Sequence, residues 1–443
     1  MKTGFSKKCI TPPMGYPIVG YYEERLTSGV ISDLYARAAA FDDGNARAVV
    51  IAVDVCYLIK PTCDHIRALV AQACGVDENA VFVTCNHTHT GPLTAADFAS
   101  DKVADPVYME SLCLACRDAA AEAFADLKDS RFFMAETKAE GVSYVRRFFL
   151  KDGRVSKPYF RADPGIIAPV GEPNHTLKLV KILREGGRDI VMVNFGTHAD
   201  TVQGNLICAD YTGFLCENLE KVLPDTDAMF LLAPQGDVVD TDFTRLDGGK
   251  VTFRKDETDI STAAPQARFM GRVLAGKALT IYDKAQEITV DRIRFACEEV
   301  TVPTHKENHR LEEAAKINAQ YEAGEFDDFP AHKKTCLAAE ARRILRMKDA
   351  PDTKKLSNFA IAFGDLVFAG LPGEPFTALR NEIETRSPFK NTIVCCLTND
   401  VGGYIPYVKA YEEGSYEVLT TENGPQTAGI LVGSMVNLLN SLE

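Results

Sequence analysis

Residues 46–89, ARAVVIAVDVCYLIKPTCDHIRALVAQACGVDENAVFVTCNHTH, decide the fold. The apolar, β-branched run at 46–59 predicts a buried strand, and residues 62–75 have the apolar spacing of a helix that ends at a glycine. Residues 80–86 predict the next strand. A strand, a helix and a second strand in this order form a β-α-β unit, whose two strands pair in parallel. The stretch therefore predicts an α/β protein.

The same alternation recurs further along the chain. Residues 189–198 (DIVMVNFGTH) and 227–237 (DAMFLLAPQGD) predict two strands, and residues 209–223 between them have the pattern of a helix. Both strands end in polar residues. Because ligands of open α/β sheets bind at the carboxyl ends of the strands, these polar residues are candidates for a functional site.

One segment departs from this alternation. Residues 305–349 are charged and helical in pattern, which predicts a helical hairpin laid on the surface. The chain shows no internal repeat, low-complexity segment or Pro/Ser-rich linker. We therefore expect one domain over residues 1–443. Its core would be a mixed, largely parallel β-sheet flanked by helices, with a helical insertion at 305–349.

Composition disfavours several classes of protein. Of the 443 residues, 46% are hydrophobic and 25% are charged, as in ordinary folded proteins. The net charge of -13 disfavours a broad nucleic-acid surface or binding to anionic lipid. No apolar run reaches the roughly 20 residues that a membrane helix needs, and no export signal is visible. Thirteen cysteines, an odd number, favour reduced thiols, so we expect a cytoplasmic protein with a small-molecule substrate.

Two histidines, His87 and His89, follow the predicted strand 80–86 in the sequence NHTHTGP. In an extended segment, side chains two residues apart point the same way, so we expect both imidazoles to enter one site. A catalytic zinc site takes imidazole and carboxylate ligands and keeps one position open for water. A His-x-His pair is a weak signal by itself, and two histidines hydrogen-bonded within a turn are the simpler alternative.

Three further candidates follow predicted strands elsewhere. His198 ends one strand, Glu374 follows another through a Pro-Gly turn, and Tyr404 follows a third. Alternatively, Glu374 is the N-cap of the helix predicted after it, and His198 is a hydrogen-bonded core histidine. The candidates form a His, His, Glu, Tyr set that suits zinc, although iron or manganese would tolerate it.

Seven short motifs are spread in order over most of the chain. They are GVISDLYARAAAFDDG (29–44), NHTHTGP (86–92), VSYVRRFFLKDGRV (142–155), NFGTHAD (194–200), ICADYTGFL (207–215), LPGEPFT (371–377) and NDVGGYIPYVKAYEEGSYEV (399–418). Together they resemble the catalytic domain of the neutral (non-lysosomal) ceramidase family, zinc-dependent amidases that hydrolyse N-acyl sphingosine, and identify the chain as similar to bacterial ceramidase-like proteins. The resemblance implies a zinc-dependent hydrolase of amide bonds.

Carried over residue by residue, the resemblance implies four zinc ligands: His87, His198, Glu374 and Tyr404. Family members often carry two tyrosines three residues apart at the last position, and this chain has Val401 at the first of the two. If the first tyrosine is the metal ligand in the family, the metal site of this chain has one ligand fewer.

The resemblance also implies two residues that act on the substrate. His89 would help to orient the reacting carbonyl, and Arg146 would face the negative charge that develops on it. Arg146 and Arg147 are otherwise a solvated basic pair. Asp237 or Asp200 would orient a ligand, unless these aspartates are helix caps.

The chain departs from the family in the segment 231–243, LLAPQGDVVDTDF. Ceramidases carry in this turn a serine that has been proposed as catalytic, and the aligned position here is Val239. Thr241 is the hydroxyl that could replace it, although the spacing permits this only weakly. The chain also lacks the C-terminal immunoglobulin-like domain of ceramidases, which argues against ceramide in a membrane as the substrate.

The mechanism that these residues predict needs only the metal. Zinc lowers the pKa of a water molecule and polarises a carbonyl, so an amide of a small N-acyl substrate could be cleaved without a serine nucleophile. Two alternatives remain open. The first is an esterase or lactonase on the same scaffold, because a fold does not fix the substrate. The second is a non-catalytic metal-binding relative, in which Val239 and Val401 mark a decayed site.

Overall fold

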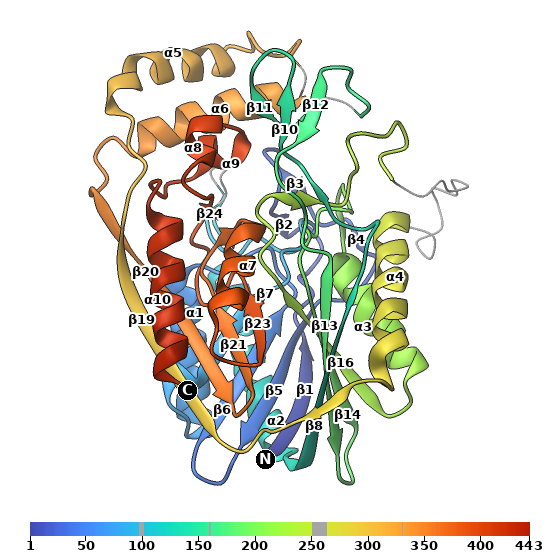
Figure 1. Ribbon diagram of the computed structural model, residues 1–443. Helices are drawn as coiled ribbons and strands as arrows, with labels where there is room; N and C mark the ends of the chain where they lie inside the picture. The colour runs from blue at the N-terminus through green and yellow to red at the C-terminus, as the bar shows by residue number, and fades with distance from the viewer. Residues whose placement is uncertain (97–101, 159–160, 250–263, 330) are drawn as a thin grey trace.

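Two β-sheets form the centre of the computed structural model (Figure 1). The structure describes residues 1–96, 102–158, 161–249, 264–329 and 331–443. The larger sheet contains β1 (Lys2–Cys9), β5 (Tyr35–Asp42), β6 (Arg47–Val53), β7 (Val81–Cys85), β8 (Lys128–Lys138), β13 (Thr176–Arg184), β14 (Asp189–Phe195), β16 (Thr226–Leu232) and β18 (Gln286–Ile288). The smaller sheet contains β19 (Ile293–Pro303), β20 (Thr353–Phe363), β21 (Leu366–Gly370) and β23 (Asn391–Cys395).

Helices and short strands complete the fold. The helices are α1 (Lys60–Cys74), α2 (Pro106–Ala125), α3 (Asp210–Val222), α4 (Pro265–Tyr282), α5 (Leu311–Glu322), α6 (Ala331–Arg346), α7 (Thr377–Arg386), α8 (Ala410–Glu413), α9 (Tyr416–Thr420) and α10 (Thr427–Ser441). The short strands are β2 (Pro17–Ile18), β3 (Arg25–Leu26), β4 (Gly29–Val30), β9 (Tyr144–Val145), β10 (Phe148–Leu150), β11 (Val155–Ser156), β12 (Ile166–Pro169), β15 (Leu206–Ile207), β17 (Val238–Val239), β22 (Glu374–Pro375) and β24 (Tyr404–Ile405).

The two predicted β-α-β units are confirmed. The first is β6, α1 and β7, with β6 and β7 paired in parallel. Helix α1 has a proline in its first turn and ends at Gly75, whose φ of 65° lies in the left-handed region that glycine adopts without strain. The second unit is β14, α3 and β16, and its two strands are also parallel. These units carry the strand ends at which the candidate histidines lie.

The mixed α/β class is confirmed, but the expectation of a largely parallel sheet is wrong. In the larger sheet, with the order β16-β14-β13-β8-β1-β5-β6-β7, the described ladders are parallel at the two edges and antiparallel between them. Short connections explain two of these antiparallel ladders. Strand β5 joins β6, and β13 joins β14, through only a few residues, and so short a connection permits antiparallel pairing only.

Side chains that alternate along the strands fill two different cores. In β6, Val49 and Ile51 pack with helices α1 to α4, whereas Val50 packs into the space between the two sheets. The outer face of the smaller sheet packs on α7 and α10. The fold therefore has four layers, helices, sheet, sheet and helices. In Figure 1, α3 and α4 border the larger sheet, and α7 and α10 border the smaller one.

The predicted helical hairpin at 305–349 is present as α5 and α6 (Figure 1). The two helices lie at the end of the molecule opposite to both chain termini, and α6 packs on α9. No helix of the described residues has the length and apolarity to cross a membrane. Each of the thirteen cysteines is a free thiol in the described part of the chain, including Cys113 and Cys116 in the buried face of α2.

Candidate active site

The four predicted zinc ligands meet at one end of the sheets. His87 follows the end of β7, and His198 follows the end of β14. Glu374 lies in β22, which follows β21, and it is the Cα partner of Tyr404 in the parallel pair β22 and β24. The four segments come from separate parts of the sequence, and it is the carboxyl ends of the strands that bring them together.

His87 and His89 approach each other, although not for the reason that the sequence indicated. Strand β7 ends at Cys85, and His87 has a φ of 67° instead of an extended conformation. A left-handed backbone is uncommon for histidine and costs conformational energy, which is a feature of functional sites. It brings the Nε2 atoms of His87 and His89 to 3.3 Å from each other. The expectation of an extended His-x-His segment is therefore wrong, while the convergence of the two imidazoles holds.

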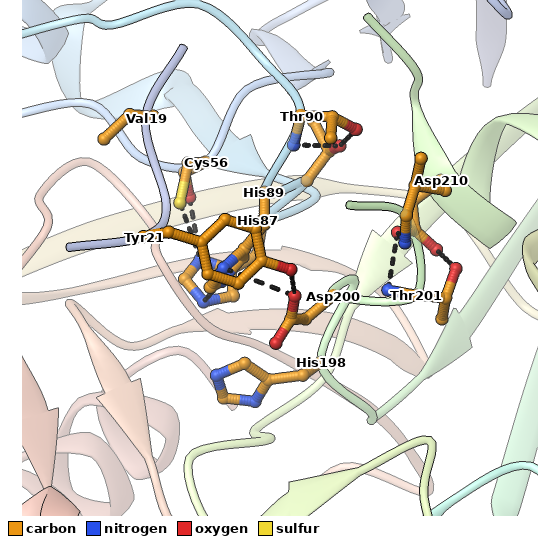
Figure 2. Close-up of polar contacts among 12 residues, drawn as sticks. Val19, Tyr21, Cys56, His87, His89, Thr90, His198, Asp200, Thr201 and Asp210 are labelled. Carbon is orange, nitrogen blue, oxygen red and sulfur yellow. Dashed lines mark hydrogen bonds and ion pairs between the residues drawn. The ribbon is translucent and has the colours of Figure 1, made fainter. Parts of the chain in front are cut away.

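Three side chains form a cluster that could hold a metal ion: His87, His198 and Glu374. Oε2 of Glu374 lies 3.1 Å from Nε2 of His87 and 3.3 Å from Nε2 of His198. All three residues are buried. Figure 2 shows the imidazoles of His87, His89 and His198 grouped together, with ring centroids 4.8 to 5.8 Å apart. The expectation that Glu374 caps α7 instead is wrong, because that helix has no side-chain cap from Glu374.

The hydrogen bonds of the two histidines fix the orientation of their rings. Nδ1 of His87 donates to the carbonyl of Cys56 at 2.9 Å. Nδ1 of His198 lies 3.1 Å from the carbonyl oxygens of Gln235 and Val238. Because a carbonyl can only accept, the proton must be on Nδ1 in each ring, and Nε2 faces the cluster. Metal-binding histidines are held by backbone carbonyls in the same way, so these residues fit a zinc ion.

The electrostatics of the cluster favour a bound cation. Burial and the Arg146 guanidinium lower the pKa of His198 to about 4, so this imidazole is neutral. Burial opposes the ionisation of Glu374, but His87 and His198 hold the pKa of its carboxyl well below the usual range. Although burial favours the neutral form of His87, the Glu374 carboxylate raises its pKa well above the ordinary value. A metal ion would replace the proton that His87 otherwise carries.

Arg146 lies beside the cluster and is held by Glu417. Nη1 of Arg146 is 3.2 Å from Nε2 of His198, and its Nε donates to Glu417 at 2.5 Å. Glu417 is fully buried, and it also lies 3.8 Å from the Arg147 guanidinium. The expectation of a solvated basic pair is therefore wrong for Arg146 and Arg147, which are both buried. Glu417 was missed from the sequence, although it lies within the motif 399–418.

Tyr404 faces the same group of side chains. Its hydroxyl lies 3.4 Å from Nε2 of His198, and the Arg146 guanidinium lies 5.3 Å from its ring centroid. The hydroxyl is therefore close enough to the cluster to act as a further ligand. Val401, at the position of the other family tyrosine, precedes two glycines in the turn before β24.

Asp200 and Tyr21 surround His89 (Figure 2). Nδ1 of His89 lies 3.7 Å from Asp200, which accepts a hydrogen bond from the Tyr21 hydroxyl. Burial lowers the pKa of His89 to about 3, although Asp200 opposes the shift, so the imidazole is neutral. Gly20 packs against the His89 ring, where a Cβ atom would lie 2.9 Å from it. No sequence pattern marked Tyr21 or Gly20, because the contact is formed by a distant loop.

The side chains of Asp237, Val239 and Thr241 are engaged in other contacts. The Asp237 carboxylate accepts from the backbone N–H and the hydroxyl of Thr377, both at 2.8 Å, so it caps α7 as the alternative expectation had it. Val239 packs in an apolar cluster with Phe148. The Thr241 hydroxyl donates to the neighbouring aspartate.

A cavity of about 170 Å³ opens beside the cluster. It is lined by Gly20, Tyr21, Tyr22, His89, Arg146, Lys157, His198, Asp200, Thr335, Tyr404, Tyr416 and Glu417. Thr335 belongs to α6, so the helical insertion contributes a residue to the wall of the cavity. A substrate in this cavity would contact His89, Arg146 and Tyr404 together.

Comparison with known proteins supports this fold. No family model and no curated protein matches the sequence. Neutral ceramidase from Pseudomonas aeruginosa aligns with 100% of this chain and 74% of its own, at a TM-score of 0.74 and 18% sequence identity. A ceramidase complexed with C2 aligns with 100% of this chain and 75% of its own, at a TM-score of 0.74 and 17% identity. The chain therefore has the fold of the neutral ceramidases, as its motifs predicted.

Proposed function

We propose that this protein is a zinc-dependent hydrolase that cleaves an amide bond of an N-acyl substrate. The observation that supports this most strongly is the cluster of His87, His198 and Glu374, in which both imidazoles are fixed by backbone carbonyls. His87, His198, Glu374 and Tyr404 would hold the metal. When bound, zinc supplies a Lewis acid for the carbonyl and lowers the pKa of water toward neutrality.

The remaining side chains have roles in the hydrolysis of the bound substrate. Arg146 lies within 3.2 Å of His198 and carries a fixed positive charge, so it would stabilise the oxyanion that forms as the carbonyl is attacked. The neutral imidazole of His89 would orient the carbonyl, and Asp200 would hold that imidazole in place. A serine nucleophile is not required, in keeping with Val239 in the apolar cluster.

A second candidate function is the hydrolysis of an ester or lactone. The observation in its favour is Val239. A valine supplies no hydroxyl nucleophile, so the site differs from that of an amidase that depends on a serine. The same groups stabilise the oxyanion in both reactions, and an ester has the better leaving group. The preference between an N-acyl compound and its ester therefore separates the two functions.

Hydrolysis measured on matched substrates tests the proposal. The protein is purified without a histidine tag and assayed with short N-acyl amines and with esters of the same acyl group, before and after chelation. Glu374→Gln removes the anionic ligand, and Glu382→Gln on the exposed face of α7 is the control. We expect amide hydrolysis that is lost on chelation, restored by zinc, reduced at least about 100-fold in Glu374→Gln and unchanged in Glu382→Gln. Activity that survives both chelation and Glu374→Gln would contradict the proposal.

A further inference from the structure

The cavity beside the cluster is small for a lipid. Its volume of about 170 Å³ lies close to the roughly 150 Å³ of an engineered cavity that binds benzene, and below the roughly 300 Å³ at which pockets for larger ligands begin. Such a space takes a group of about the size of an amino-acid side chain. The two long chains of an N-acyl sphingosine would extend out of this space.

Three separate segments enclose this space. Tyr22, from the loop between β2 and β3, lies with its hydroxyl 3.5 Å from that of Tyr416 in α9. Thr335 of α6 borders the same cavity. Helices α6 and α9 also pack on each other, so the helical insertion borders the cavity on this side.

Most charged side chains around the cavity have a close polar partner. Arg146 pairs with Glu417, and Asp200 interacts with Tyr21 and His89. Lys157 also lines the cavity, and among the described residues it makes no ion pair. Its ammonium group lies 5.5 Å from the centroid of the Phe243 ring.

The surroundings of Lys157 favour an anion next to it. Burial and the nearby positive charge of Arg146 lower the pKa of Lys157, and the carboxylates of Asp200, Glu417 and Asp240, which act in the opposite direction, do not offset them. The charged form of Lys157 is therefore incompletely solvated. An anionic group of a bound molecule would compensate for the lost hydration. A hydrogen bond between the Lys157 ammonium and a carboxylate would join two charged groups, and such hydrogen bonds are stronger than those between neutral groups.

We propose that the substrate is a small N-acyl compound with a free carboxylate, such as an N-acyl amino acid, and that Lys157 binds this carboxylate. The inference rests on the proposed function and adds the substrate class to it. In the reaction, water adds its hydroxyl to the acyl carbon, the C–N bond breaks and the nitrogen takes the proton. The products are a carboxylic acid and a free amino acid. Lys157 would determine specificity and takes no part in bond breaking.

Matched substrates and variants test this inference. N-acetyl-leucine and N-acetyl-leucinamide have nearly the same shape. They differ in the group that Lys157 would bind, which is a carboxylate in the first compound and a neutral amide in the second. Lys157→Met removes the ammonium group with little change in side-chain volume. Lys151→Met is the control, because Lys151 is an exposed lysine in the same β10–β11 hairpin. We expect wild type to prefer N-acetyl-leucine by about 10- to 100-fold in kcat/KM, and Lys157→Met to abolish the preference while Lys151→Met keeps it.

The outcomes separate the inference from the proposed function. If both compounds are hydrolysed equally and Lys157→Met changes neither rate, the inference is overturned and the amidase proposal holds. If no amide is hydrolysed, the amidase proposal fails, and calorimetric titration with the same two compounds decides the inference. Tighter binding of N-acetyl-leucine by wild type, lost in Lys157→Met, supports it. Equal binding of the two compounds, or binding of neither, overturns it.

Discussion

The buried charge pair of Arg146 and Glu417 leads to a prediction about stability. The Arg146 side chain is 7% exposed and that of Glu417 is not exposed at all, so water screens their contact of 2.5 Å very little. Glu417→Gln keeps the shape of the side chain but leaves the positive charge of Arg146 uncompensated in the interior. Removing one partner of such a pair costs about 3–5 kcal/mol, which corresponds to roughly a 100- to 10,000-fold change in the unfolding equilibrium.

Urea unfolding of wild type, Glu417→Gln, Arg146→Met and the double variant measures this cost. The double variant removes both charges, so we expect it to be more stable than the sum of the two single losses predicts. Glu287→Gln is the control, because Glu287 forms a similar contact with Arg131 at 2.6 Å on the solvent-exposed surface. A loss in Glu417→Gln no larger than in Glu287→Gln, or additive losses in the double variant, would refute the reasoning.

The same pair predicts a dependence of stability on pH. Burial raises the pKa of the Glu417 carboxyl, but Arg146 and Arg147 outweigh burial and lower it below its ordinary value. A carboxyl with a lowered pKa in the folded state stabilises the fold fully above the unfolded pKa of about 4.3. This contribution is lost as the pH falls through the lower, folded pKa. The stability difference between wild type and Glu417→Gln should therefore be largest near neutral pH and should shrink below about pH 4.3.

Three further variants test separate parts of the site. Arg146→Met should lower kcat by about 100- to 1,000-fold in steady-state kinetics, because it removes the charge that would face the oxyanion in the proposed reaction; an unchanged kcat would exclude this role. Asp200→Asn should lower kcat/KM by about 10- to 100-fold while the metal content stays at the wild-type value, since Asp200 lies 3.7 Å from His89 and would orient it without contacting a proposed metal ligand; loss of the metal would show a different role. Asp237→Ala should reduce the free energy of unfolding by about 1–2 kcal/mol through the loss of the α7 cap, with unchanged hydrolysis of N-acyl substrates; a large loss of activity would place Asp237 in the reaction instead.

The sequence predicted the local units of this fold better than their pairing. The apolar pattern of residues 46–86 identified β6, α1 and β7 because burial repeats with the period of each element. The antiparallel order in the middle of the larger sheet was missed, since β1, β8 and β13 pair with strands that lie far away in the sequence. The helical insertion was predicted from its charge pattern, but no pattern within it indicated that Thr335 would border the cavity.

The candidate site shows the same division. The histidines and Glu374 could be proposed because polar residues directly after buried strands gather at one end of a sheet, and the motifs added Arg146 and Tyr404. The left-handed conformation of His87 could not be foreseen, because it depends on hydrogen bonds such as that from its backbone N–H to the carbonyl of Val55. Glu417 was missed for a similar reason: a buried charge is recognised from its partner, and the partner lies far away in the sequence.

The metal content of the purified protein tests the central claim most directly. Elemental analysis is made on wild type, His87→Ala, His198→Ala and Glu374→Ala, and on His65→Ala as a control at an exposed histidine of α1. We expect about one zinc ion per chain in wild type and in the control, and its loss in the three cluster variants. Absence of zinc from wild type, with none bound after zinc is added, would contradict a zinc centre at these residues.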